Sequence, residues 1–408
     1  ANALTRYAFE ALKADNVIIM MQCENKKSIA VAERLGFTNE GIKDRDRLDC
    51  VSDLPAKNII YAAHNIDNLP PLELSWLDKN NSNTDTQMIA WAKEELKITD
   101  EKAFSSSRTI VVTPWSCVLE INTGKTRVYL KHTPDLLALE ADIIALLDKQ
   151  LNIRVPKIIA HNTTLNCFLM QDAGKTLRVI LKKNFDVELF CKVINNFTSM
   201  QLSVADDVST FIDMGVPDWR LEQLPHLYRN LLSKKEILIA DGLSAQQIYI
   251  LETLIPAITK QCQQLAAYGI KPSIVQPDFH DNNILIQQQS QAITLIDLGE
   301  IVISQPLFSL VGLLQQAQKH YNLNERDPAY QKLQETYLQP FQIVAANKNN
   351  IIAALKHTRL LHPLYAVLSY IRLLEACDKN QLHAFYGRRR INAPLQSLIH
   401  NMQTHDYS

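Results

Sequence analysis

Residues 273–306, SIVQPDFHDNNILIQQQSQAITLIDLGEIVISQP, constrain the fold of this chain more than any other stretch. Two short apolar runs, ILI and ITLI, flank a short polar segment, so we predict a pair of antiparallel strands. Asn283 directly precedes the first run and Asp297 directly follows the second. An antiparallel pairing would bring these two side chains to the same end of the pair. Asp and Asn are also common turn residues at strand ends, so a purely structural loop is the alternative interpretation.

The polar residues of this stretch also allow a functional interpretation, in which they predict a site that binds phosphate groups. The side-chain oxygens of Asn283 and Asp297 suit a hard cation such as Mg²⁺ carrying nucleotide phosphates. Asp278, five residues before Asn283, is placed to accept a proton from an attacking hydroxyl. Upstream, Lys131 ends the strand-like segment RVYLKH, and Glu140 follows nine residues later in a predicted helix. A strand lysine, a helical acid and then this Asp and Asn set is the order of parts that phosphoryl transfer requires in a kinase-type fold.

The distribution of glycine excludes several common nucleotide-binding loops. The chain has only ten glycines, and no two are closer than Gly36 and Gly41. A Walker loop, a dinucleotide-binding fingerprint and an ordinary glycine-rich kinase loop are therefore absent as literal motifs. A nucleotide would have to be held by a different backbone geometry.

The first part of the chain, residues 1–66, is predicted to form a small α/β unit. Residues 1–14 carry apolar positions at helical spacing, and residues 16–23 form an apolar run short enough for a buried strand. An amphipathic helix ended by Gly36 follows, and then two further strands, TNEGIKDRDRL and NIIYAAH. This unit is too small to bury a substantial core alone.

The segment QCENKKSIAVAERLGFTNEGIKDRDRL resembles the C-terminal half of a GNAT-superfamily N-acetyltransferase. The resemblance implies that Asn25 and Ser28 open the helix beside the acetyl-CoA arm and that L-G-F closes it. The pyrophosphate loop of that family would lie upstream of Ala1, and such a loop works through backbone N–H groups at a helix N-terminus. Acetyl-CoA is therefore expected as a cofactor only if the upstream half is present, and this chain is expected to lack acetyltransferase activity. An inert remnant is the alternative.

Residues 67–84 are rich in Asn, Asp, Pro and Ser and are predicted to be a linker. Regular patterning returns in residues 85–408, with a helix at 86–98 and strands within 107–132 that meet at a turn at 122–124. A helix over 135–151 and a strand at the start of 167–174 follow. Helices dominate beyond about residue 185. Strands followed by helices, with the motif at their join, predict an α+β fold of two lobes.

The joint pattern resembles the aminoglycoside phosphotransferase family over residues 85–400, most strongly at QPDFHDNNIL and LIDLGEIVISQPLFSL. This resemblance implies a two-lobed protein-kinase-like fold and an ATP- and Mg²⁺-dependent transfer of phosphate to a hydroxyl of a small molecule. It implies that Asp278 is the catalytic base and that Asn283 and Asp297 are the metal ligands. It also implies that Lys131 contacts the nucleotide phosphates with Glu140 as its partner.

Two departures from the family pattern leave an alternative open. Gln276 and Pro277 stand where the family has His and Gly, although Gln can still donate a hydrogen bond. The segment TPWSCV contains no glycine, although its backbone N–H groups and the Ser116 hydroxyl could reach a phosphate. His280 and Asp281 are interpreted as polar loop residues outside the metal site. A catalytically inactive kinase-like module that binds a nucleotide or another ligand is the alternative function.

The composition of the chain limits the binding partners that we expect and indicates the cellular compartment. A formal charge of −1 and a near-neutral pI do not favour nucleic acid or an anionic membrane as a partner, and the basic run at 388–390 is interpreted as a solvated face. Seven dispersed cysteines indicate reduced thiols and a cytoplasmic protein.

The apolar segment 360–377 includes charged and helix-bending residues, so we predict a packed helix rather than a membrane span. Residues 351–400 are rich in Lys and Arg, which favours a neutral or anionic acceptor over a polycationic antibiotic.

Overall fold

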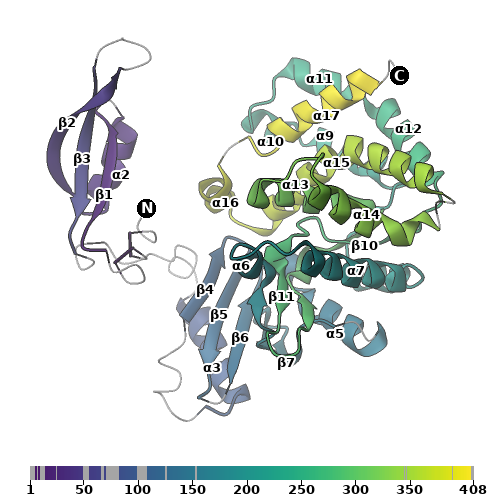
Figure 1. Cartoon of the computed structure of the whole chain (residues 1–408), viewed down its shortest axis with the longest axis horizontal. Helices are drawn as coiled ribbons and strands as arrows, with labels where there is room; N and C mark the ends of the chain where they lie inside the picture. Colours follow the sequence, from purple (N-terminus) through teal and green to yellow (C-terminus); the bar gives the residue numbers. More distant parts are fainter. Residues whose placement is uncertain are drawn as a thin grey trace. The chain divides into compact units, whose positions relative to one another are not determined.

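The computed structural model describes residues 5–6, 8–9, 14–23, 25–48, 55–65, 69, 82–98, 108–124, 126–151, 154–343, 345, 347–387 and 389–405. The chain divides into two compact units, Ala1–Thr86 and Gln87–Ser408 (Figure 1). Among the described residues, no helix is both long enough and apolar enough to cross a membrane.

The first unit contains an antiparallel sheet of strand order β1-β3-β2 with helix α2 packed on one face. Its elements are β1 Val17–Gln22, α2 Lys26–Arg34, β2 Thr38–Leu48 and β3 Pro55–Ala63. Asn25 caps α2, because its side-chain oxygen accepts a hydrogen bond from the backbone N–H of Ser28 at 3.1 Å. The predicted order of strand, helix and two strands is confirmed. The helix predicted at 1–14 lies mostly outside the described residues.

The second unit begins with a five-stranded antiparallel sheet of order β4-β5-β6-β8-β7. Its strands are β4 Arg108–Thr113, β5 Ser116–Asn122, β6 Arg127–His132, β7 Ile158–Asn162 and β8 Cys167–Gln171. Side chains alternate between the two faces along β6. Leu130 faces helix α3, whereas Tyr129 and Lys131 face the cavity described below. Helix α3 (Ser82–Glu95) starts inside the segment predicted as linker, so that prediction was wrong for its last residues.

The prediction of one continuous helix over 135–151 is confirmed for Glu140–Leu151 and was wrong at its start. A 3₁₀ turn at Asp135–Leu137 precedes α5 (Glu140–Leu151). The turn starts after Pro134. The Pro134 carbonyl accepts a hydrogen bond from the Leu137 N–H at 2.9 Å. The Thr133 hydroxyl donates a hydrogen bond to the Leu137 carbonyl at 3.3 Å. This break in the helix places Glu140 in the first turn of α5, next to β6.

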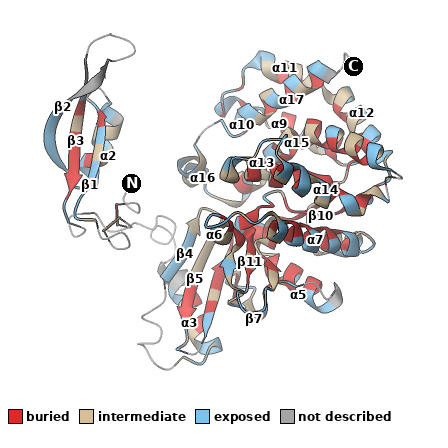
Figure 2. Cartoon of the chain, in the orientation of Figure 1, coloured by how far each residue is buried: buried red, intermediate tan, exposed pale blue. Residues whose placement is uncertain are grey.

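Helices make up most of the remainder, and their inward faces form one large core (Figure 2). They are α6 Leu177–Leu181, α7 Val187–Val204, α8 Val208–Met214, α9 Leu224–Ser233, α10 Lys235–Ala240, α11 Ala245–Thr253, α12 Ile255–Ala266, α13 Leu307–Tyr321, α14 Pro328–Gln342, α15 Lys348–Ala376, α16 Lys379–Tyr386 and α17 Asn392–His405. The segment predicted as a packed helix at 360–377 lies within α15 except for its last residue, and it buries much of its surface.

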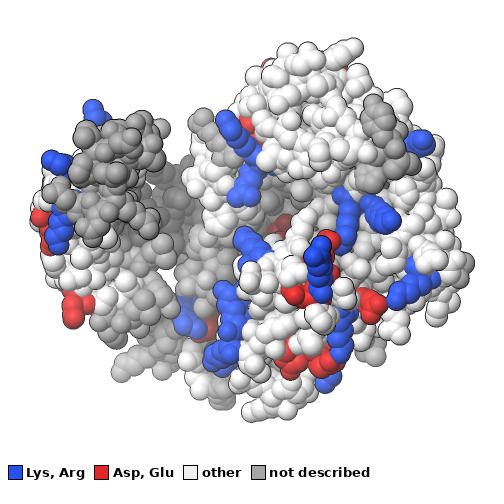
Figure 3. Space-filling view, turned by 45° about the horizontal axis from the view of Figure 1, so that its top comes forward, with Lys and Arg blue, Asp and Glu red and all other residues white. Residues whose placement is uncertain are grey.

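Two small sheets lie where the strand-rich and helical parts meet. One has the order β12-β11-β9, and the other pairs β10 with β13. Their strands are β9 Lys175–Thr176, β10 Ser273–Val275, β11 Ile284–Ile286, β12 Ile293–Leu295 and β13 Val302–Ser304. On the face of the molecule in Figure 3, basic and acidic side chains of the second unit lie interspersed.

Candidate active site

The predicted strand pair is present as β11 and β12, which are antiparallel, with Ile284 opposite Leu295. The backbone N–H of Ile296 donates to the carbonyl of Asn283 at 3.0 Å, so the pairing extends to the end where the polar residues lie. Asn283 and Asp297 both line one cavity. The structure therefore brings together the two residues that the sequence predicted to lie close.

Asp297 adopts the left-handed backbone conformation, with φ 59° and ψ 43°. This conformation is uncommon outside glycine, asparagine and aspartate. Two contacts hold it: the Gln276 amide donates to the Asp297 carbonyl, and the Leu298 N–H donates to Glu140 Oε1 at 3.2 Å. Two residues further on, a side chain in place of Gly299 would crowd the turn, since a Cβ there would lie 3.0 Å from the carbonyl oxygen of Leu137. The backbone thus aims the Asp297 carboxylate at β6.

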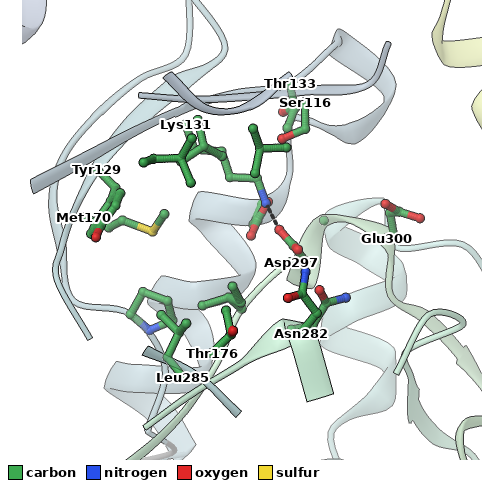
Figure 4. A pocket seen from close by; sticks show the side chains of 18 of the residues that line it. Ser116, Tyr129, Lys131, Thr133, Met170, Thr176, Asn282, Leu285, Asp297 and Glu300 are labelled. Carbon is green, nitrogen blue, oxygen red and sulfur yellow. Dashed lines mark hydrogen bonds and ion pairs between the residues drawn. The ribbon is translucent and has the colours of Figure 1, made fainter. Parts of the chain in front are cut away.

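Lys131 lies between two carboxylates. Its Nζ is 2.7 Å from Glu140 Oε2 and forms a second ion pair with Asp297 (Figure 4). Burial alone would lower the pKa of Lys131, but the charges of Asp297 and Glu140 outweigh it and raise the pKa. Lys131 therefore stays charged, with its ammonium group fixed in the cavity wall. The sequence predicted its pairing with Glu140 and did not predict its pairing with Asp297.

The cavity has a volume of about 350 Å³ and two chemically different ends. Tyr129, Met170 and Leu285 lie at the apolar end, away from Asp297 and Glu300 (Figure 4). Gly174 helps to shape that end: a Cβ there would lie 2.2 Å from the carbonyl oxygen of Ile286, so only glycine lets the two backbones approach so closely. An apolar slot beside a fixed cation suits a ligand with a flat apolar ring and an anionic tail.

Asp278 lies on the loop ahead of β11, at the open side of the cavity, and its side chain is 57% exposed. The Asn282 N–H donates to Nδ1 of His280 at 3.2 Å, so a neutral His280 carries its proton on Nε2, which lies 3.1 Å from Asp278 Oδ2. Enclosure in the cleft would raise the pKa of Asp278, but the hydrogen bond from His280 and the positive charge of His280 in its protonated form lower it. The carboxylate is therefore ionised near neutral pH and able to accept a proton.

Asn283 and Asp297 have donor atoms that fit Mg²⁺. The Asn283 amide nitrogen donates to the carbonyl of Asp278 at 3.1 Å, which fixes the side chain and leaves its Oδ1 as an acceptor. The side chain of Asp297 is 40% exposed, so its carboxylate is accessible from the cavity even though Lys131 holds one oxygen. Oxygen-only donors of this kind match a hard divalent cation.

Ser116 lines the same cavity, beside the turn between β4 and β5. Thr113 pairs with Ser116 across this two-residue turn, and its hydroxyl donates to the Ser116 carbonyl at 3.2 Å. At the tip, the ring of Trp115 stacks on Tyr386 of α16 with centroids 5.1 Å apart and an interplanar angle of 6°. In this hairpin, side-chain contacts hold a turn that contains no glycine.

Asp281 is a polar loop residue, as the sequence predicted: it is buried and accepts hydrogen bonds from Arg178 at 2.7 and 3.0 Å and from the Tyr321 hydroxyl, so it anchors the loop. Sequence reasoning missed two parts of the site. Glu300 lines the cavity, and Trp115 joins the β4–β5 turn to α16. The sequence offered one usable signal, the acidic residue that ends LIDLGE. The other contacts join residues far apart in the chain.

By sequence, the chain matches no protein-family model and no curated protein. Among solved structures, it is similar to an ethanolamine kinase from Plasmodium vivax, with a TM-score of 0.54, 12% identity, and coverage of 81% of this chain and 93% of that chain. It is also similar to the complex of gentamicin with APH(2″)-IIa, with a TM-score of 0.50, 15% identity, and coverage of 77% of this chain and 98% of that chain. At this identity the likeness shows the fold.

Proposed function

We propose that the second unit, whose fold is similar to that of these small-molecule kinases, is an ATP-dependent phosphotransferase that moves the γ-phosphate to a hydroxyl of a small molecule. The observation that carries this proposal is the ammonium group of Lys131, held between Glu140 and Asp297 in the wall of a cavity that Asp278 also lines. A fixed cation, an ionised carboxylate and a pair of oxygen donors are what in-line phosphoryl transfer needs.

Each residue has a distinct part in the proposed reaction. The adenine ring occupies the apolar end, and Lys131 binds the α- and β-phosphates with Ser116 near the phosphate chain. Asn283 and Asp297 hold Mg²⁺, which neutralises phosphate charge. Asp278 accepts the proton as the acceptor oxygen bonds to the γ-phosphorus and the bond to ADP breaks.

The experiment compares Asp278→Asn with Asp297→Asn. In Asp278→Asn the amide keeps the shape of the side chain but cannot accept the proton, so we expect phosphoryl transfer to fall by about 10²–10⁴-fold with nearly unchanged Mg-nucleotide binding. Asp297→Asn should weaken Mg²⁺-dependent nucleotide binding itself. Nucleotide titrations with and without Mg²⁺, followed by a screen of hydroxyl compounds for ADP release, measure both effects.

Two results would point to the alternative of an inactive ligand-binding module. The first is nucleotide binding by the wild-type protein without ADP release for any hydroxyl compound. The second is an equal effect of both substitutions on binding, which would make Asp278 a structural loop residue.

For residues 1–66 we propose the C-terminal half of an N-acetyltransferase. The support is the order β1, α2, β2, β3 and the Asn25 cap on α2. Acetyl transfer by this 408-residue chain, measured as release of free CoA, would contradict the expectation that the chain alone is inactive in that reaction.

A further inference from the structure

A second cavity lies in the helical part of the second unit and has a volume of about 560 Å³. Helices α9 and α15, which contact one another, form two of its walls (Figure 1). Among the described residues, its lining shares no member with the lining of the cavity that holds Lys131 and Asp278. The proposed phosphoryl transfer therefore makes no use of this second cavity.

The inner side of the second cavity is apolar and held in place. Its buried lining residues are Trp219, Leu231, Leu368 and Ile371. The Trp219 ring meets the ring of Tyr365 edge-on with centroids 5.2 Å apart, and the Trp219 backbone N–H donates to the carbonyl of Ile303 at 2.8 Å. A preformed apolar cavity of this size is typical of a site for a small molecule.

The charges that line the second cavity leave one cation without a counter-charge. The charged lining residues among the described ones are Lys234, Arg372 and Glu375. Lys234 forms an ion pair with Glu375, so these two charges compensate one another. Within the described part of the chain, Arg372 forms no ion pair with a carboxylate. The lining therefore favours an anionic ligand.

Burial lowers the pKa of Arg372, and the charge of Glu300 opposes this only in part. An arginine side chain nevertheless stays protonated in a protein. A largely buried cation without a carboxylate beside it is costly, and an anionic partner would reduce that cost.

The guanidinium group of Arg372 also has donors that the fold does not use. Nη1 donates to the carbonyls of Glu300 at 3.0 Å and Ile301 at 3.2 Å, and Nη2 donates to the carbonyl of Gly299 at 3.0 Å. A guanidinium group carries five N–H donors. Two of them, the Nε–H and one N–H of Nη2, make no hydrogen bond within the described residues. Because Arg372 lines the second cavity, a ligand there can reach them.

Nε and Nη2 of an arginine form one planar edge that can donate to both oxygens of a carboxylate. This protein uses that edge elsewhere: Arg220 donates from Nε to Asp218 Oδ1 at 2.9 Å and from Nη2 to Asp218 Oδ2 at 2.7 Å. The donors that remain on Arg372 therefore match a carboxylate.

We propose that the second cavity is a ligand site for a small carboxylic acid with an apolar body. The carboxylate accepts hydrogen bonds from Nε and Nη2 of Arg372, and the apolar body lies against Trp219 and Leu231, where it is removed from water. This site is independent of the proposed phosphotransferase function. A bound carboxylate would contact the same guanidinium group that holds the turn after Asp297.

The test titrates octanoate into the full chain by ligand-observed NMR. Octanamide serves as the uncharged counterpart, and acetate serves as the anion without an apolar body. We expect octanoate to bind the wild-type protein at least about tenfold more tightly than either compound. Arg372→Gln should remove the preference for octanoate over octanamide. Arg372→Lys should retain part of it, because lysine keeps the charge but not the planar pair of donors.

A second variant leaves Arg372 in place, because Arg372 also contacts the turn after Asp297. Leu227→Trp, at a half-buried lining position on α9, should fill part of the cavity and weaken octanoate binding about tenfold or more. Leu202→Trp, at an exposed position on α7 outside the cavity, is the matched control and should bind octanoate like the wild-type protein.

Four results would overturn the proposal. They are no preference of the wild-type protein for octanoate, a preference over octanamide that survives in Arg372→Gln, unchanged octanoate binding in Leu227→Trp, and displacement of octanoate by a non-hydrolysable ATP analogue with Mg²⁺. The last result would place octanoate in the cavity of Lys131. Failure of the proposed function has a different signature, because the ATP analogue would then not bind while octanoate binding is still measured.

Discussion

The side-chain amide of Gln276 donates a hydrogen bond to the backbone carbonyl of Asp297, 21 residues further along the chain. Gln276 is buried, and its backbone N–H is bonded in turn to the hydroxyl of Ser309 at 3.0 Å. Asp297 itself adopts the left-handed conformation. The hydrogen bond from Gln276 therefore stabilises the backbone conformation that directs the Asp297 carboxylate. Gln276 stands at the position where the aminoglycoside phosphotransferase pattern has histidine.

Gln276→Leu should weaken both folding and nucleotide binding. Leucine has a similar volume but no donor, so the enclosed carbonyl of Asp297 loses its partner, at a cost of about 1–3 kcal/mol. Gln276→His keeps an N–H donor and should retain more of both properties. Urea unfolding and a nucleotide titration in Mg²⁺ measure the two effects. Equal behaviour of the Leu variant and wild type would show that Asp297 is held by other contacts.

Lys131→Met should reduce nucleotide affinity or turnover, because the fixed positive charge for the phosphates is lost and Glu140 and Asp297 are left to repel them. Glu140→Gln should act in the same direction but more weakly, since Glu140 orients the lysine. Lys192→Met, at an exposed position on α7, is the matched control. The measurement is nucleotide binding by calorimetry together with ADP release. Unchanged affinity and turnover in Lys131→Met would remove Lys131 from the proposed site.

The hairpin of the site was predictable because its information is local. Two apolar runs of strand length flank a short polar turn, and the period of the pattern fixes which ends meet. The proximity of Asn283 and Asp297 follows from this antiparallel pairing. The same holds for Lys131, since alternation along β6 places it on the face opposite Leu130.

The rest of the site depends on contacts between segments that are far apart in the chain, and a local sequence pattern does not encode such contacts. The apolar stripe of residues 135–151 continues without a gap, yet the helix is broken where Gly299 packs against the carbonyl of Leu137. Arg372 lies more than 70 residues from the carbonyls that it binds. Glu300 lines the cavity because this packing positions the turn Leu298–Glu300.

Trp115→Ala should speed the release of a bound nucleotide. The indole ring stacks on Tyr386 and meets Phe385 edge-on at 5.1 Å, so it attaches the β4–β5 turn to α16. Aromatic pairs of this kind contribute about 0.5–1.5 kcal/mol beyond their buried area, which predicts up to about a tenfold faster release. Stopped-flow displacement of a fluorescent ATP analogue measures the rate.

Trp115→Phe is the control for this prediction, because it keeps an aromatic ring at the tip of the turn and should release the nucleotide more slowly than the Ala variant. Identical release rates in wild type and Trp115→Ala would show that the stack does not restrain the turn during binding.

His362, inside helix α15, should make the folded chain less stable as the pH falls. Burial lowers the pKa of His362 to about 4, against an ordinary value of 6.5. Between these two values the unfolded chain binds a proton that the folded chain does not, so the free energy of unfolding decreases as the pH falls from 6.5 toward 4. A full shift of this size corresponds to about 3 kcal/mol, and partial exposure of the side chain reduces the expected loss to roughly 1–3 kcal/mol.

The measurement is the free energy of unfolding in urea at several pH values for wild type and for His362→Gln, which cannot take up a proton. Other groups contribute to the pH dependence of both proteins, including Glu120, whose hydrogen bond from Arg108 lowers its pKa. The difference between the two curves isolates His362. It should be constant above about pH 7 and should narrow or reverse toward pH 4, since only wild type loses stability through protonation of this side chain in the unfolded chain. Two parallel curves would show that His362 takes up its proton equally in the folded and unfolded chain.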